Sequence, residues 1–147
     1  MARAAAAITS GSIGRSPVTA LIGRDEELNL LQRRWQQAKT GEGRLVLLSG
    51  DPGIGKSRLV AELLAAIDVP AVHGRCLPYG EGITYWPVVE VVKQIAALPS
   101  DPAAASVLRS LLGESEQATS ADEIGWAFRR LVEEHAPLVV CLEDIQW

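Results

Sequence analysis

Cysteine, long hydrophobic runs and strong net charge are scarce or missing in this chain of 147 residues. The two cysteines, Cys76 and Cys141, lie far apart, which excludes a dense disulfide framework and favours a reducing compartment. No run approaches the roughly 18 consecutive apolar residues that a membrane-spanning helix needs. The net charge of −4 gives no whole-domain basic surface for nucleic acid or an anionic membrane. The sequence therefore predicts a cytoplasmic segment with no direct nucleic-acid or membrane binding.

Acidic residues are also missing from residues 1–17, which are rich in Ala, Ser and Gly. The apolar stretch at the start is shorter than a signal-peptide core of roughly 7–15 residues. We expect residues 1–17 to be a flexible tail or interdomain linker, with an organelle-targeting signal as the alternative. The whole chain is 48% hydrophobic, so the remaining residues, 18–147, have enough apolar side chains for one globular core.

Helix-like and strand-like patterns alternate after the tail. We expect Asp25 to cap a first helix whose first turn carries Glu26 and Glu27, acids that complement the helix dipole. An apolar run over 44–49 predicts a buried parallel strand, followed by a glycine-rich turn, a helix and a short strand over 69–73. This alternation predicts an α/β fold with a parallel sheet.

The second half of the sequence predicts three further helices. Pro87 suits a first helical turn, and Val88 begins the apolar face, although the valine-rich run also suits a strand. Asp101 precedes a proline and can open the next helix. Ser120 and Glu123 have capping-box spacing at the start of the last helix.

A glycine-rich loop follows the first predicted strand and has the Walker A pattern G-x-x-x-x-G-K-[ST]. The glycines permit backbone conformations in which N–H groups converge on a phosphate, and the next helix points its positive end there. Lys56 is expected to reach the β- and γ-phosphates, and the Ser57 hydroxyl to complete the Mg²⁺ shell. The predicted nucleotide-binding residues of this region are Gly50, Asp51, Pro52, Gly53, Ile54, Gly55, Lys56, Ser57 and Arg58.

An apolar strand over 138–142 leads to Glu143 and Asp144, which is the Walker B arrangement. Ligands of open α/β sheets bind at the carboxyl ends of the strands. We expect Glu143 to hold Mg²⁺ through water and Asp144 to orient or deprotonate the attacking water, with exchanged roles as the alternative. The predicted catalytic residues are therefore Lys56 and Asp144, and the predicted cofactors are ATP and Mg²⁺.

Four segments, in this order, resemble one protein family. They are Leu21–Leu28 (Leu-Ile-Gly-Arg-Asp-Glu-Glu-Leu), the Walker A loop, Gly74–Pro87 and Cys141–Trp147. Together they resemble the AAA-like, STAND-type signalling ATPase module of bacterial multidomain regulators. That module accompanies class III adenylate/guanylate cyclases or belongs to LuxR-type transcription regulators. The stretch Tyr-Gly-Glu-Gly-Ile-Thr-Tyr-Trp-Pro, which ends at Pro87, favours the cyclase-associated branch.

This resemblance implies a P-loop NTPase three-layer fold and an ATP-dependent switch that controls an attached cyclase or DNA-binding domain. It also implies that Gly23 and Arg24 lie near the adenine end of the nucleotide. In this class the strand after Walker B inserts between the Walker A and Walker B strands, and nothing follows Trp147 here. The resemblance thus implies that residues 18–147 are the N-terminal part of the domain. We expect the sheet to be incomplete, truncated after the Walker B strand, and the segment alone to be a poor ATPase.

Two other functions stay open on the sequence. A P-loop kinase would transfer the phosphate to a small acceptor in place of water. A nucleotide-binding scaffold would retain ATP without turning it over.

Several residues that could suggest other chemistry are expected to be structural. His73 and Cys76 have no second ligand pair at zinc spacing. Cys141, inside an apolar strand, is expected to be a small buried residue. Trp126 falls off the main apolar face of its helix, so partial burial is expected there.

Overall fold

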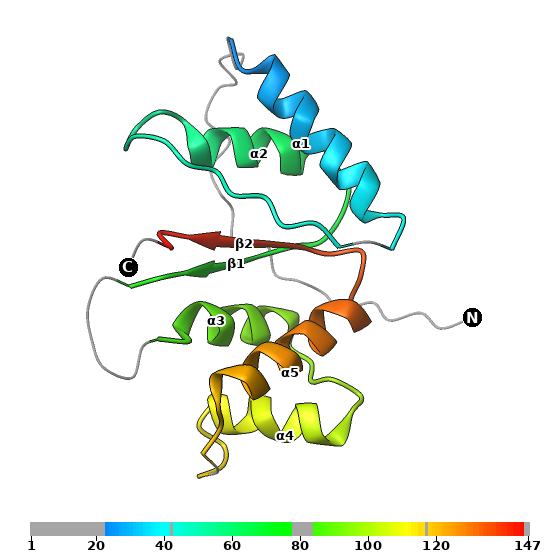
Figure 1. The fold of residues 1–147 in the computed structure, drawn as a ribbon, viewed down its shortest axis with the longest axis vertical. Coiled ribbons are helices and arrows are strands. Elements are labelled where there is room, and N and C mark those ends of the chain that lie inside the picture. Colours follow the sequence, from blue (N-terminus) through cyan, green and yellow to red (C-terminus); the bar gives the residue numbers. More distant parts are fainter. Residues whose placement is uncertain (1–22, 42, 78–83, 117, 146–147) are drawn as a thin grey trace.

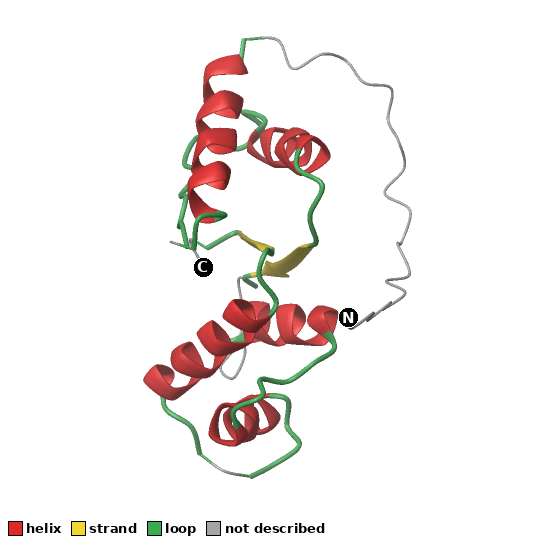
Figure 2. Cartoon of the chain, turned by 90° about the vertical axis from the view of Figure 1, so that its right-hand side faces the viewer, coloured by secondary structure: helices red, strands yellow, loops and turns green. Residues whose placement is uncertain are grey.

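The computed structural model describes residues 23–41, 43–77, 84–116 and 118–145. The helices are α1 (Asp25–Ala38), α2 (Lys56–Ala66), α3 (Trp86–Ile95), α4 (Pro102–Leu111) and α5 (Ala121–Glu134), and the strands are β1 (Ala71–Arg75) and β2 (Val139–Glu143). β1 and β2 pair in parallel. Helices α1 and α2 lie on one side of this sheet and α3, α4 and α5 on the other (Figures 1 and 2). The predicted α/β fold with a parallel sheet is therefore confirmed, whereas the predicted tail lies outside the described residues.

The main core lies where α3, α4 and α5 meet. Its central side chains, Leu108 and Leu131, are completely buried. The other buried members of this cluster are Val92, Ala104, Val107, Ile124 and Ala127. Pro87 lies in the first turn of α3, so the valine-rich run forms a helix and not a strand. Among the described residues, no helix is long and apolar enough to cross a membrane.

Helix starts follow the local sequence in two of three predicted cases. The Asp101 carboxylate accepts hydrogen bonds from the first-turn N–H groups of α4. Ser120 and Glu123 form the predicted capping box of α5, and these hydrogen bonds lower the pKa of Glu123. The expectation for Asp25 was wrong, because Arg24 is the N-cap of α1 and Asp25 is already helical. The acid still lies in the first turn, where it complements the dipole.

The 44–49 segment (Arg44-Leu-Val-Leu-Leu-Ser49) is the largest departure from expectation. It joins no strand ladder, and the exposed fractions of Leu45 and Leu47 are 99% and 69%. The prediction of a buried strand here is wrong for this structure. A strand exists only where a neighbour supplies hydrogen bonds, and the described sheet consists of β1 and β2 alone. In the view of Figure 1, the segment passes between α2 and β2.

The two observed strands differ less from expectation. β1 begins at Ala71, two residues after the predicted start at position 69. β2 is only half-buried, and Leu142 is 45% exposed. The expected full burial of this strand and of Cys141 is therefore wrong, because β1 is the only strand that pairs with β2 within the described residues.

Side chains of α3 cover the edge of β1 that faces away from β2. The His73 N–H donates to Gln94 Oε1 at 2.9 Å, and Gln94 Nε2 donates back to the His73 carbonyl. The Arg75 N–H donates to Glu90 Oε2 at 2.7 Å. Four residues of helix rise about 6 Å, close to the two-residue spacing of a strand, so Glu90 and Gln94 match this edge.

Gly74 allows this close approach of α3 to β1. A Cβ atom at Gly74 would lie 2.4 Å from the carbonyl oxygen of Pro87, closer than real contacts allow. Within α3, the Lys93 ammonium lies 5.8 Å from the ring centroid of Trp86, a cation–π contact between the last and first turns of the helix. Trp126 on α5 is 37% exposed, as its place on the helix predicted.

Candidate nucleotide site

The Walker A loop leads directly into the start of α2. Gly50, Gly53 and Gly55 have φ angles of 156°, 80° and 95°, a region that residues with a Cβ rarely adopt. Gly55 is the N-cap of α2, which has no side-chain cap and no acidic residue in its first turn. The N-cap residue therefore supplies no side-chain acceptor for the amides at this helix end, and the dipole favours an anion there.

Lys56 lies across the loop. Its ammonium donates to the Gly50 carbonyl at 2.7 Å and to the Asp51 carbonyl at 3.0 Å. This places a positive charge beside the loop amides, where both would meet a polyphosphate. Arg58, in the first turn of the helix, instead lies 3.4 Å from Glu62 on the exposed face of α2. Its contact with nucleotide stays a prediction.

Arg24, which belongs to the Leu21–Leu28 segment, contacts the same loop. Arg24 Nη2 donates to the Ile54 carbonyl at 3.0 Å, and Arg24 Nη1 pairs with Glu27 at 3.2 Å. Gly23, with φ 77°, immediately precedes this arginine. The structure therefore brings Arg24 to the Walker A loop, whereas the predicted adenine contact of Gly23 and Arg24 stays a prediction.

The two acids follow one another at the end of β2. Glu143 is the last residue of the strand and lies opposite Arg75 in the register. Asp144 has φ 57°, a left-handed conformation that is uncommon outside glycine. In Figure 1 the Walker A loop and the carboxyl ends of β1 and β2 lie at the same end of the molecule. This is the end at which open α/β sheets bind ligands.

Arg75 is the site residue that sequence reasoning missed. Its Nε atom donates to Asp144 Oδ2 at 2.9 Å. The neighbouring Cys76 N–H donates to the Glu143 carbonyl at 2.9 Å. Arg75 is the last residue of β1, and parallel strands place their carboxyl ends at one edge of the sheet, but no local pattern records which residues of the two strands lie opposite each other.

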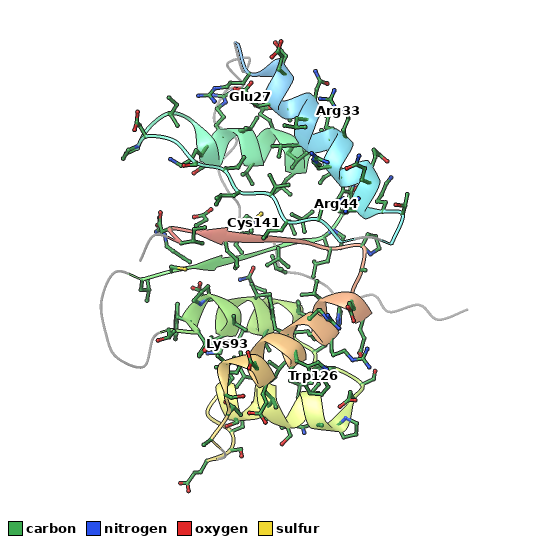
Figure 3. The ribbon with its side chains drawn as sticks, in the orientation of Figure 1. Glu27, Arg33, Arg44, Lys93, Trp126 and Cys141 are labelled. Atoms are coloured by element: carbon green, nitrogen blue, oxygen red, sulfur yellow. The ribbon has the colours of Figure 1, made fainter. Side chains whose placement is uncertain are left out.

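Cys141 lies on β2, two residues before Glu143 (Figure 3). Burial, with a smaller contribution from the Glu143 carboxylate, raises the pKa of its thiol. The sulfur is therefore protonated near neutral pH, which does not suit a nucleophile. This agrees with the structural role expected for Cys141.

The residues present fit a magnesium nucleotide. The uncapped amides of α2 and the ammonium of Lys56 suit phosphate oxygens. The Ser57 hydroxyl and the Glu143 carboxylate are the oxygen ligands that Mg²⁺ prefers. No group of three or more His, Cys, Asp or Glu residues that could hold a metal occurs in the described part of the chain.

Comparison with known proteins identifies the family. The family of AAA ATPase domains matches residues 20–147. The chain belongs to this family. The AAA-type part of the resemblance is thus confirmed, and it indicates an ATP-binding and ATP-hydrolysing module.

The chain is also similar to an uncharacterized protein of Rhizobium meliloti (strain 1021). It is 30% identical over 148 residues, which cover 85% of this chain and 14% of that protein. The chain therefore spans only a small part of the length of the curated relative that it matches. Comparison with solved structures gives no significant match.

Proposed function

We propose that this AAA ATPase domain binds ATP with Mg²⁺ and hydrolyses it in the intact protein, as a nucleotide switch for an attached signalling or transcription-regulating domain. The observation that carries the proposal is the start of α2. There three glycines with positive φ lead into uncapped helix amides, and Lys56 bridges the loop. A switch suits such a site, because the γ-phosphate can hold segments that relax after hydrolysis.

Each site residue has a distinct part in the proposed reaction. The loop amides and Lys56 hold the phosphates, and Lys56 exchanges its loop carbonyls for phosphate oxygens. Ser57 and Glu143 would hold Mg²⁺, in part through water, and the ion would neutralise phosphate charge. Asp144 takes the proton of the attacking water as the water oxygen bonds to the γ-phosphorus. The bond to the bridging oxygen breaks, and its electron pair leaves with ADP.

The sheet that supports this site is proposed to gain a further strand in the intact protein. The 44–49 segment exposes Leu45 and Leu47, and the neighbouring end of β2 exposes Leu142. The other edge of the sheet is already covered by α3, since Gln94 accepts a hydrogen bond from the His73 N–H of β1. These observations support a strand added between the 44–49 segment and β2. The segment described here would then be a poor ATPase by itself.

Nucleotide binding is tested by Lys56→Ala, with Lys39→Ala at the C-cap of α1 as a control that removes the same charge elsewhere. We expect Lys56→Ala to weaken binding of a fluorescent ATP analogue to the intact protein by about 10- to 100-fold, since a charge-assisted hydrogen bond is lost. Lys39→Ala should leave the affinity unchanged. Equal affinities of the two variants would refute the assignment of the Walker A loop.

Hydrolysis is tested by phosphate release without an added acceptor. Mg²⁺-dependent release that Lys56→Ala abolishes is the expected result. A P-loop kinase would release little free phosphate, because it transfers the phosphoryl group to an acceptor instead of to water. A scaffold would retain ATP unchanged, so either of these outcomes would contradict the proposed hydrolysis.

A further inference from the structure

The ion pair between Arg75 and Asp144 joins two strand ends at the candidate site. Arg75 Nε lies 2.9 Å from Asp144 Oδ2, which is a normal charge-assisted hydrogen bond. The two residues are 69 positions apart, and the parallel register of β1 and β2 brings them together. The contact is therefore a product of the tertiary fold.

Stability gives a weak reason for this pair. The side chains of Arg75 and Asp144 are 63% and 41% exposed. Exposed ion pairs contribute little to folding, because water screens the charges and two long side chains lose freedom. A role in the chemistry of the neighbouring acids accounts for the contact better than a role in folding.

Arg75 is well placed to orient another group, because its own backbone is fixed on both sides. The Arg75 N–H is held by Glu90 of α3 at 2.7 Å. The next N–H, that of Cys76, holds the Glu143 carbonyl at 2.9 Å. Gly74, on the other side, lets α3 approach so closely that a Cβ would clash with Pro87. The Gly74-Arg75-Cys76 run thus connects α3 to the two acids.

Asp144 needs such an orienting group. It leaves the strand with φ 57° and is not held by the β2 ladder, which ends at Glu143. A carboxylate that must take a proton from one water has to present an oxygen in a defined direction. The hydrogen bond from Arg75 Nε to Oδ2 restrains the orientation of this carboxylate.

We propose that Arg75 is a positioning residue for ATP hydrolysis, which holds Asp144 so that its second oxygen faces the attacking water. The proposal rests on the proposed function of this site. Arg75 itself touches neither ATP nor the water. Its loss should therefore affect turnover and leave nucleotide binding intact.

The test compares Arg75→Gln and Arg75→Lys in the intact protein. We expect Arg75→Gln to lower kcat about tenfold with KM and ATP-analogue affinity unchanged, as supporting residues of catalytic groups commonly do. Arg75→Lys keeps the charge and should recover part of the loss. Arg129→Gln is the matched control, because Arg129 Nε pairs with Glu133 at 3.3 Å on an exposed face of α5.

A double-mutant cycle with Asp144→Asn identifies the group on which Arg75 acts. In the Asp144→Asn background, Arg75→Gln should change kcat less than about twofold, since the positioned carboxylate is gone. A full tenfold loss in that background would overturn the proposal. An unchanged or raised kcat of the Arg75→Gln single variant, relative to wild type, would overturn it as well. A raised kcat would mean that the pair restrains the acid.

The experiment distinguishes failure of the proposed function from failure of the role of Arg75. Wild-type protein that releases no phosphate with Mg²⁺ and ATP would refute hydrolysis, and the role of Arg75 with it. If the wild-type protein turns over ATP and the Arg75→Gln variant has the same kcat, only the role of Arg75 is refuted. The melting temperatures of Arg75→Gln and Arg129→Gln should agree, because both remove one exposed ion pair.

Discussion

Asp144 is the residue on which the proposed chemistry depends most. An amide keeps the size of its side chain but takes no proton from water, so Asp144→Asn should reduce single-turnover phosphate release about 100-fold or more. ATP-analogue affinity should stay within about twofold, because Asp144 is assigned to the water and not to the phosphates. Asp122→Asn, in the exposed first turn of α5, is the control. Equal loss of binding and turnover would reject this assignment of roles.

Residues that act through near neighbours in sequence were predicted well. Asp101 and Ser120 cap helices by bonding N–H groups within three positions, so the local sequence holds all the information. The Walker A glycines likewise lie in one short loop. Arg75 was missed because its partner, Asp144, depends on the register between two strands that are far apart in sequence. No local pattern records that register.

At the scale of elements, α3 acts as a cover for the edge of the sheet. Gln94 satisfies the His73 N–H and carbonyl, the two groups that a neighbouring strand would pair. Gln94→Ala should therefore destabilise the fold by about 1–3 kcal/mol, the usual net effect of two lost hydrogen bonds. It should also promote concentration-dependent self-association through the opened edge of β1.

The control for this prediction is Gln36→Ala on the exposed surface of α1. Denaturant unfolding gives the free-energy difference, and light scattering gives the association. Two variants with the same unfolding midpoint and the same scattering would show that Gln94 does not protect the edge.

Helices and strands were not equally predictable. The helices α3, α4 and α5 have hydrophobic periodicity and start signals within their own sequence. A strand is defined by pairing with another segment, so its apolar residues alone do not ensure that it forms. The 44–49 segment has the composition of a buried strand but pairs with nothing among the described residues. The candidate site shows the same difference, since its Walker A loop was predicted and the Arg75–Asp144 contact between its strand ends was not.

At the scale of the whole molecule, the apolar surface is unevenly distributed. The core between α3, α4 and α5 is buried, whereas the side of the sheet near the Walker A loop exposes Leu45, Leu47 and Ile54. Such a group of exposed apolar side chains is expected at a surface that other protein covers. In the proposed complete sheet, the added strand pairs with the 44–49 segment on one side and β2 on the other, and so joins the Walker A and Walker B ends into one rigid support.

This completion of the sheet gives opposite expectations for two forms of the protein. Leu45 is 99% exposed here, so Leu45→Ala should change the unfolding free energy of residues 1–147 by less than about 0.5 kcal/mol. In the intact protein the same side chain would be buried, and its truncation should cost about 2–5 kcal/mol. Leu30→Ala, at a site on α1 that is 45% exposed, should affect both forms equally. A leucine that is buried beside the added strand cannot lose three carbons without leaving a cavity. If Leu45→Ala destabilised the intact protein as little as the segment, the added strand would therefore lie elsewhere.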